Sequence, residues 1–419
     1  VLQQLENPLT QDSGVNDCFK PVSKYWDRIY RPEQLLTALP EAMRVLADPA
    51  QTGSVTLCLP QDVQAESFDF PENLFDKKVY INERLSVTPA ALQEALSLIQ
   101  AAKQPLIVAG GGIHYSEAED SLRHFAEKTG IPVVVSQAGK GSLLERHPQC
   151  LGSVGATGNL AGNQAASEAD LVINIGTRLS DFTTASKSQF QNPDVRFIAV
   201  NVNPMDAHKH GAFPLTGDAR AVLDDLADAV GDHSVSSEYA NIISSWKADW
   251  ERAHAEIVHP ENDEGPLYQS EVIHILNEFG DENSTTIHAS GGVPGDIHKL
   301  WNCKAAMDYH SEYGYSCMGY EIAGAMGVKM ADPSREVYAL VGDGSYMMLS
   351  QDVVTSIQEG LKITVILLDN HGFQCIRGLQ TSCGGKDFGN EFRARESESN
   401  RLEGEFGEIA FCGDAKSMG

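Results

Sequence analysis

Short apolar runs alternate along this chain with segments of helical spacing, and this alternation limits the possible folds more than any other feature. The runs are apolar at every position, which is typical of strands that are covered on both faces. Strands of this kind, joined by helices, build parallel sheets with helices on either side. We therefore expect an α/β fold of consecutive doubly wound domains. The predicted strands cover residues 105–109, 131–135, 171–175, 197–202, 336–341 and 363–368.

The 419 residues suit two or three domains of ordinary size. We expect the end of one domain in residues 1–78, a complete central domain in 79–231, a polar linker with one exposed helix in 232–266, and a third domain in 267–419. The first segment has a predicted helix over 32–48 and a strand over 54–59, which cannot bury a core alone. The chain begins without Met and ends within a predicted helix, so we expect a piece of a longer protein, with the third domain incomplete. One side of the first helix carries Leu35, Leu36, Leu39, Met43 and Leu46.

Composition excludes some classes of partner. The chain has 31 basic and 58 acidic residues, a net charge of −27, which argues against nucleic acid and anionic membranes as partners. No apolar run approaches the roughly 20 residues that span a bilayer. The eight cysteines form no C-x-x-C pair, and the start of the chain lacks the features of a signal peptide, so we expect reduced thiols and a cytoplasmic location.

Two special turns follow neighbouring predicted strands. The strand over 336–341 leads directly into Gly342-Asp343-Gly344-Ser345, and the next strand ends in Asp369-Asn370-His371-Gly372. One strand–helix–strand crossover places the two turns at the carboxyl ends of adjacent parallel strands, where open α/β sheets bind ligands.

The residue types in these turns favour a metal–diphosphate site. Asp343, Asn370 and a nearby backbone carbonyl would offer the oxygen ligands that Mg²⁺ prefers. Gly342 and Gly344 allow close backbone approach, and the amides of Gly344 and Ser345 can donate to a diphosphate. The alternative is a plain Asp-Gly turn, which a lone G-D-G would favour.

This pattern resembles the thiamine-diphosphate-dependent enzymes, whose signature is G-D-G followed after about 25–30 residues by N-N. Here Asp369 stands in place of the first Asn, and Asn370 matches the second, which is the metal ligand in the family. The resemblance implies thiamine diphosphate and Mg²⁺ as cofactors, with Asp343, Asn370 and the Gly372 carbonyl as metal ligands. The implied cofactor contacts are Gly292, Val293, Met318, Gly342, Asp343, Gly344, Ser345, Asn370, Gly372 and Phe373.

Two further segments carry this resemblance. Cys317-Met318-Gly319-Tyr320 is similar to the T-M-G-Y of acetohydroxyacid synthases, in which the Met side chain holds the cofactor bent. An ordinary core Met is the alternative for Met318. The loop over 291–295 lies where the family has a second diphosphate-contacting loop, although Gly-Pro turns are common.

Four longer segments, residues 59–66, 176–184, 298–301 and 312–321, resemble one branch of this family, hydrolases that open a cyclic 1,2-dione in myo-inositol breakdown. The resemblance implies hydrolytic cleavage of the carbon–carbon bond between two carbonyls, 5-deoxyglucuronate as product, no flavin, and a homodimer or homotetramer. The family's activating Glu would lie upstream of Val1, so no catalytic residue is assigned. The alternatives are an acetohydroxyacid synthase or 2-keto-acid decarboxylase, and a non-catalytic scaffold chain.

Other clusters have simpler interpretations. The Gly110-Gly111-Gly112 turn is not G-x-G-x-x-G and predicts no dinucleotide site. Arg178 resembles a flavin-contacting Arg of acetohydroxyacid synthases, and His208-Lys209-His210 is typical of a solvated loop. His288 and His310 flank the cofactor segments as structural residues or as acid–base groups for the substrate.

Overall fold

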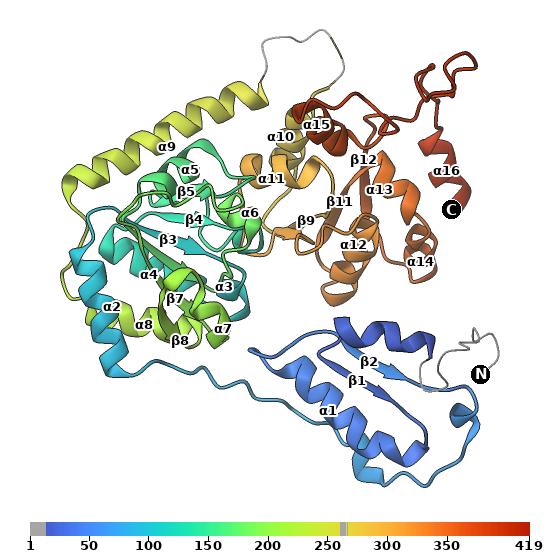
Figure 1. Cartoon of the computed structure of the whole chain (residues 1–419), viewed down its shortest axis with the longest axis horizontal. Coiled ribbons are helices and arrows are strands. Elements are labelled where there is room, and N and C mark those ends of the chain that lie inside the picture. The colour runs from blue at the N-terminus through green and yellow to red at the C-terminus, as the bar shows by residue number, and fades with distance from the viewer. Residues whose placement is uncertain (1–13, 260–264, 266) are drawn as a thin grey trace. The chain divides into compact units, whose positions relative to one another are not determined.

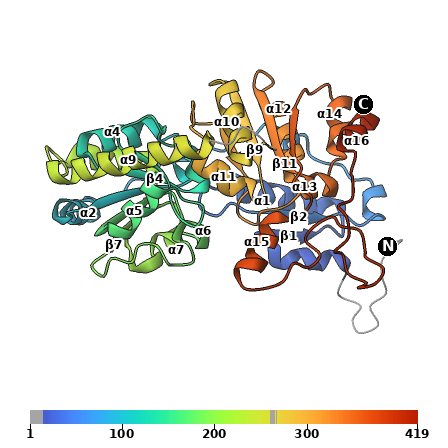
Figure 2. The same ribbon diagram turned by 90° about the horizontal axis from the view of Figure 1, so that it is seen from above.

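The computed structural model describes residues 14–259, 265 and 267–419, and the chain forms two compact units that join between Leu85 and Ser86. Each unit is described by itself. Figures 1 and 2 show the ribbon in two views. No helix of the described residues is long and apolar enough to cross a membrane.

The first unit contains a two-stranded parallel sheet. Strand β1 (Tyr25–Arg28) pairs with β2 (Val55–Cys58), and helix α1 (Leu35–Ala47) connects them. The predicted helix and second strand are confirmed. The first strand was not predicted, because Tyr-Trp-Asp-Arg is too polar to stand out as an apolar run. Short 3-10 turns η1 (Val15–Val22), η2 (Pro32–Gln34), η3 (Val63–Ala65) and η4 (Glu72–Phe75) complete this unit.

Helix α1 does not bury the apolar stripe seen in its sequence. Its fully buried residues are Ala38 and Ala42, whereas Leu39, Met43 and Leu46 are exposed. A two-stranded sheet leaves little depth for large side chains, so small residues face it.

The second unit begins with a sheet of six parallel strands in the order β5-β4-β3-β6-β7-β8. This sheet confirms the expected parallel α/β architecture. Two of its strands, β5 and β8, were not predicted. The strands are β3 (Pro105–Ala109), β4 (Val133–Val135), β5 (Cys150–Ser153), β6 (Leu171–Ile175), β7 (Arg196–Asn201) and β8 (Phe213–Thr216).

Helices cover both faces of this central sheet (Figure 1). Successive strand residues alternate between two cores: Ile107 and Ala109 face the one lined by α2, α4 and α8, while Leu106 and Val108 face the one lined by α5 and α9. The helices are α2 (Pro89–Ala101), α3 (Gly112–Tyr115), α4 (Glu119–Thr129), α5 (Leu160–Glu168), α6 (Asp181–Thr184), α7 (Pro204–Ala207), α8 (Ala219–Ala229) and α9 (Ser237–Val258), with 3-10 turns η5 (Gln137–Gly139) and η6 (Lys209–Gly211).

Helix α9 lies in the segment for which we expected a polar linker with an exposed helix. The helix is present, but Tyr239 and Ile243 are buried in the central core, and the Tyr239 hydroxyl donates to the carbonyl of Pro105 at 3.2 Å. The expectation of an exposed helix is therefore wrong, because part of α9 packs against α5 and buries these two residues. Residues 260–264 and 266 of that segment lie outside the described part.

A second parallel sheet has the order β10-β9-β11-β12. Its strands are β9 (Ser284–His288), β10 (Tyr309–Ser311), β11 (Glu336–Gly342) and β12 (Thr364–Leu368). Because β9 and β12 flank β11, the loops after these three strands emerge at one edge of the sheet. The helices are α10 (Gln269–Phe279), α11 (Val293–Leu300), α12 (Tyr320–Ala331), α13 (Asp343–Met348), α14 (Asp352–Gln358), α15 (Gln374–Ser382) and α16 (Phe411–Met418).

The glycine turn after β3 is closed by backbone packing. The amide of Gly112 donates to the carbonyl of Gly176 at 2.9 Å, and a Cβ on Gly112 would lie 2.5 Å from the Gly176 Cα. Gly176 itself has φ +61°, a conformation that favours glycine. The two turns therefore touch backbone to backbone, which explains their glycines without a bound nucleotide.

We expect Gly112→Ala to lower the free energy of unfolding by about 1–3 kcal/mol, the usual range for overpacking. The added methyl group would meet main-chain atoms, which cannot rotate away. Gly378→Ala is the matched control, because Gly378 lies inside α15 with no atom within 4 Å of its added Cβ. Urea unfolding of both variants would measure the difference, and equal stabilities would contradict this account of the turn.

Candidate active site at the carboxyl edge of the second sheet

Asp343 lies at the end of β11, buried at the first position of helix α13. Its Oδ1 accepts a hydrogen bond from the Gly344 amide at 2.7 Å, and its Oδ2 accepts one from the Gly372 amide at 2.8 Å. The second bond joins the loops after β11 and β12. The structure thus brings the two turns together, as their spacing predicted, and the contact between them is made by the Gly372 amide.

Asn370 and Asp369 lie in the same loop after β12, and both are exposed. The backbone carbonyl of Asn370 accepts from the Gln374 side chain at 3.0 Å. The Asp369 carboxylate accepts from the His371 amide at 3.1 Å and also interacts with Asp343. Gly372 has φ +139°. The loop is therefore folded over the Asp343 carboxylate.

Several groups shift the pKa of the Asp343 carboxyl in opposite directions. Burial raises its pKa, the amides of Gly344 and Gly372 oppose that effect, and the neighbouring Asp369 raises the pKa further. Two carboxyl groups side by side, one of them buried, form an environment that a divalent cation would stabilise.

Glu321 connects three segments of the site, a role that its position in the sequence did not predict. Its buried carboxylate accepts the Ser345 hydroxyl at 2.7 and 2.9 Å, the Gly319 amide at 3.1 Å, and the backbone amide of Ser290. Burial raises the pKa of Glu321 against these donors. The residue thus joins the loops after β9 and β11 to the start of α12. A charged residue between Tyr320 and the apolar Ile322 was the available signal.

The same network includes Gly319, the residue that follows Met318. The amide of Gly319 also donates to the Ser345 hydroxyl oxygen at 2.7 Å, so the residue next to Met318 is bonded to the loop after β11. Met318 is half-buried. Because the Ser345 hydroxyl is committed to Glu321 and Gly319, only its backbone amide remains for an anion.

The remaining predicted contact residues lie on two neighbouring segments. Phe373 packs on Gly344, where an added Cβ would lie 2.6 Å from the ring, so a larger residue there would displace the Phe373 ring. Gly342 is half-buried at the last position of β11. Gly292 is exposed and Val293 is buried at the start of α11, in the loop that reaches Glu321 through Ser290.

The two candidate histidines differ. His288 is fully buried at the end of β9, packs edge-on against Tyr309 with ring centroids 4.6 Å apart, and has no hydrogen-bond partner within the described residues. Burial, together with the nearby His310 and His298, lowers its pKa well below the ordinary value, so the ring stays neutral. His310 is exposed and its Nε2 lies 2.7 Å from the Tyr320 hydroxyl.

The other clusters lie on the central domain. His210 Nε2 is 3.4 Å from the Leu179 carbonyl, and its ring packs near Phe197. Arg178 is exposed after the closed glycine turn. Across the described ranges, no group of three or more His, Cys, Asp or Glu side chains is placed to hold a metal. At Asp343 the contacts of the carboxylate are the Gly344 and Gly372 amides, and the Asn370 side chain and the Gly372 carbonyl remain predicted ligands.

Two family models match the chain. The central domain of the thiamine pyrophosphate enzymes matches residues 92–226, and their C-terminal TPP binding domain matches residues 289–419. This chain belongs to the thiamine pyrophosphate enzymes. The site at Asp343 therefore lies in the domain that binds the cofactor in this family.

Similar curated proteins share one name, 3D-(3,5/4)-trihydroxycyclohexane-1,2-dione hydrolase. The chain is 45% identical over 442 residues to that of Clostridium tetani, covering 100% of this chain and 69% of the relative. It is 46% identical over 441 residues to that of Geobacillus thermodenitrificans, covering 100% and 68%. The protein of Bacillus cereus strain AH820 is 45% identical over 442 residues, with 100% and 69% covered.

We expect Ser345→Ala to lower the free energy of unfolding of the cofactor-free protein by about 1–3 kcal/mol, because the buried Glu321 carboxylate would lose its hydroxyl donor. Ser356→Ala is the control: Ser356 is also buried, but it bonds only the nearby Val353 carbonyl at 2.8 Å. Its loss should cost less than about 1 kcal/mol, within the range of a single local hydrogen bond. Equal losses in urea unfolding would show that Glu321 does not depend on Ser345.

Proposed function

We propose that this protein hydrolyses trihydroxycyclohexane-1,2-dione to 5-deoxyglucuronate in myo-inositol catabolism, using thiamine diphosphate and Mg²⁺. The observation that carries the proposal is the buried Asp343 carboxylate. It accepts hydrogen bonds from the Gly344 and Gly372 amides and so holds the loops after β11 and β12 together. The substrate assignment is supported by the shared name of relatives 45–46% identical over the whole chain.

The residues at this edge fit the metal and the diphosphate. Asp343, the Asn370 side chain and the Gly372 carbonyl would hold Mg²⁺, because hard oxygen donors with a single negative charge leave ligand positions for phosphate oxygens. The amides of Gly344 and Ser345, at the start of α13, would donate to the diphosphate. The loop over Gly292 and Val293 is proposed to contact the same group.

Thiamine diphosphate supplies a nucleophilic carbon that adds to a carbonyl group and stabilises the negative charge left when the neighbouring carbon–carbon bond breaks. The chain's own residues bind and orient it. Met318, beside the Ser345–Glu321 network, is proposed to support the cofactor in a bent conformation. The reaction is redox-neutral, so the substrate requires water and no flavin or nicotinamide.

A cytoplasmic location and a homodimeric or homotetrameric state are part of the proposal. The location is supported by the eight cysteines, all of them free thiols in the structure. Self-association is supported by the exposed apolar side chains of Met347, Met348 and Leu349, which directly follow the candidate diphosphate loop. Sedimentation of the purified protein would measure the oligomeric state.

Product analysis tests the reaction. The full-length protein, supplied with Mg²⁺ and thiamine diphosphate, should release one equivalent of carboxylic acid per cyclic dione consumed, and it should leave pyruvate unchanged. Consumption of pyruvate without the dione would instead assign a synthase or decarboxylase. No turnover of either substrate, with cofactor bound, would favour the non-catalytic scaffold.

We expect Asp343→Ala to abolish Mg²⁺-dependent binding of thiamine diphosphate, since the variant removes the charged ligand of the proposed metal. Asp369→Asn is the matched control, because it removes the other carboxylate of the pair while keeping a side chain of the same shape. The control should bind the cofactor at least as tightly as the parent protein. Calorimetric titration with and without Mg²⁺ measures both, and retained Mg²⁺-dependent binding in Asp343→Ala would overturn the site.

A further inference from the structure

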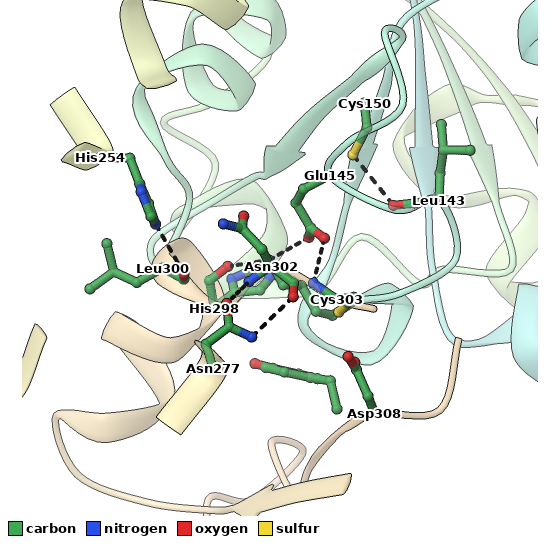
Figure 3. Close-up of polar contacts among 12 residues, drawn as sticks. Leu143, Glu145, Cys150, His254, Asn277, His298, Leu300, Asn302, Cys303 and Asp308 are labelled. Atoms are coloured by element: carbon green, nitrogen blue, oxygen red, sulfur yellow. Dashed lines mark hydrogen bonds and ion pairs between the residues drawn. The ribbon is translucent and has the colours of Figure 1, made fainter. Parts of the chain in front are cut away.

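Helix α11 connects the candidate diphosphate loop to the central domain. It begins at Val293, directly after Gly292, and ends at Leu300. Helix α11 packs against α10 of its own domain, and a segment of the central domain, Gln137–Glu145, which follows strand β4, bonds to the backbone at both of its ends. Figure 3 shows part of this junction, with Glu145, His298, Leu300 and Cys303 close together.

Gln137 holds the first turn of α11. Its side-chain amide donates to the Pro294 carbonyl at 3.0 Å, and its Oε1 accepts the Tyr309 hydroxyl at 2.5 Å. Gln137 and Tyr309 are both buried. One side chain of the central domain thus fixes the beginning of α11 and the neighbouring strand β10 at the same time.

Lys140 holds the last turn of α11. Its buried Nζ donates to the His298 carbonyl at 3.0 Å and pairs with the Glu145 carboxylate at 2.7 Å. Burial alone would lower the pKa of Lys140, but the Glu145 carboxylate together with Cys303 and Cys150 raises it overall, so the ammonium stays charged. A positive charge at a carbonyl of the last turn is favourable to the helix dipole.

Three more bonds support the same helix. Thr157 Oγ1 lies 2.8 Å from His298 Nδ1, and His254 Nε2 lies 3.0 Å from the Leu300 carbonyl. The Cys303 amide, just beyond the helix, donates to Glu145 Oε2 at 2.8 Å. Burial and the Lys140 charge lower the pKa of His298 to about 3, so its ring is neutral. Both ends of α11 are therefore anchored outside their own domain.

A cavity lies beside this junction, but its charged lining residues are already bonded to the protein and do not form a ligand site. It has a volume of about 320 Å³ and is lined in part by Lys247, Lys304 and Glu145. Lys247 donates to three backbone carbonyls, and Lys304 donates to carbonyls at the end of α10. Glu145 is paired with Lys140. These charged groups are already bonded, so the network serves the structure of the junction.

We propose that Gln137 and Lys140 of the central domain are positioning residues for the diphosphate loop over 289–293, and that they set the affinity for the cofactor without touching it. This inference rests on the proposed function. Because α11 is fixed at both ends, the loop before it is held in one conformation before the cofactor arrives, and the entropy of ordering that loop is not lost on binding.

The test uses Gln137→Met in the full-length protein, a substitution of similar size that removes the hydrogen bonds to Pro294 and Tyr309 and a third, longer one to Thr157 at 3.3 Å. Binding of thiamine diphosphate in the presence of Mg²⁺ should weaken about tenfold, the effect of losing one or two hydrogen bonds. The value of kcat at saturating cofactor should stay unchanged. Amide hydrogen exchange of residues 289–300 in the cofactor-free protein should become faster, a readout that needs no activity.

Thr129→Val is the matched control. Thr129 is fully buried in the same domain, and its hydroxyl also makes two hydrogen bonds, to the Phe125 carbonyl and from the Ile131 amide. It lies before β4, whereas Gln137 follows that strand. The control should lose stability. Its affinity for the cofactor and the amide hydrogen exchange of residues 289–300 should both stay unchanged. A loss of affinity in the control equal to that in Gln137→Met would overturn the proposal.

Lys140 requires a paired variant, because Lys140→Met alone would leave Glu145 buried without its partner and endanger folding. The double variant Lys140→Met/Glu145→Gln removes both charges together and should also weaken cofactor binding with kcat retained. If the parent protein binds no thiamine diphosphate, the proposed function fails. If the parent binds it and both variants bind it equally well, the proposed function stands and the positioning role is wrong.

Discussion

The candidate site depends on one buried carboxylate, that of Glu321. A carboxylate in this position is costly unless several donors surround it, and here the donors come from the loop after β9, from the residue before α12, and from the loop after β11. Satisfying one charge therefore forces three separate segments to converge. Asp343 repeats the principle on a smaller scale, because its two oxygens bind the amides of Gly344 and Gly372. In both cases a few strong hydrogen bonds fix backbone segments that no apolar contact would hold so specifically.

The parts of this arrangement that the sequence predicted are those encoded locally. A fully apolar strand such as Pro105–Ala109 identifies itself by its pattern, and two such strands joined by a helix place their carboxyl ends side by side. That rule alone predicts that the turns holding Asp343 and Asn370 lie side by side, whereas Gly372 was implied only by the family resemblance. The G-D-G turn supplies the Asp343 carboxylate at this position, and its second glycine leaves room for the Phe373 ring.

The parts that the sequence did not predict depend on contacts between distant segments. In the sequence, Glu321 looks like a charged residue on the surface of a helix. Only the structure shows that the Ser345 hydroxyl bonds its carboxylate. Helix α9 is polar enough to be a linker, yet the burial of Tyr239 and Ile243 joins it to the central core. The apolar pattern of α1 also predicts the wrong buried residues, since Ala38 is buried and Leu39 is exposed. Periodicity states which residues share a face, and only the tertiary structure states which face is covered.

These contacts also show what the central domain contributes to the rest of the chain. Its glycine turns are closed on each other, because the Gly112 amide bonds the Gly176 carbonyl where a nucleotide fold would leave space. The carboxyl edge of its sheet is nevertheless used: Gln137 follows β4, Thr157 follows β5, and both contact α11. The edge that binds a ligand in related folds here binds a helix of the neighbouring domain. The side chains of Gln137 and Thr157 thus hold the helix that follows the candidate cofactor loop, by reaching the Pro294 carbonyl and the His298 ring of α11.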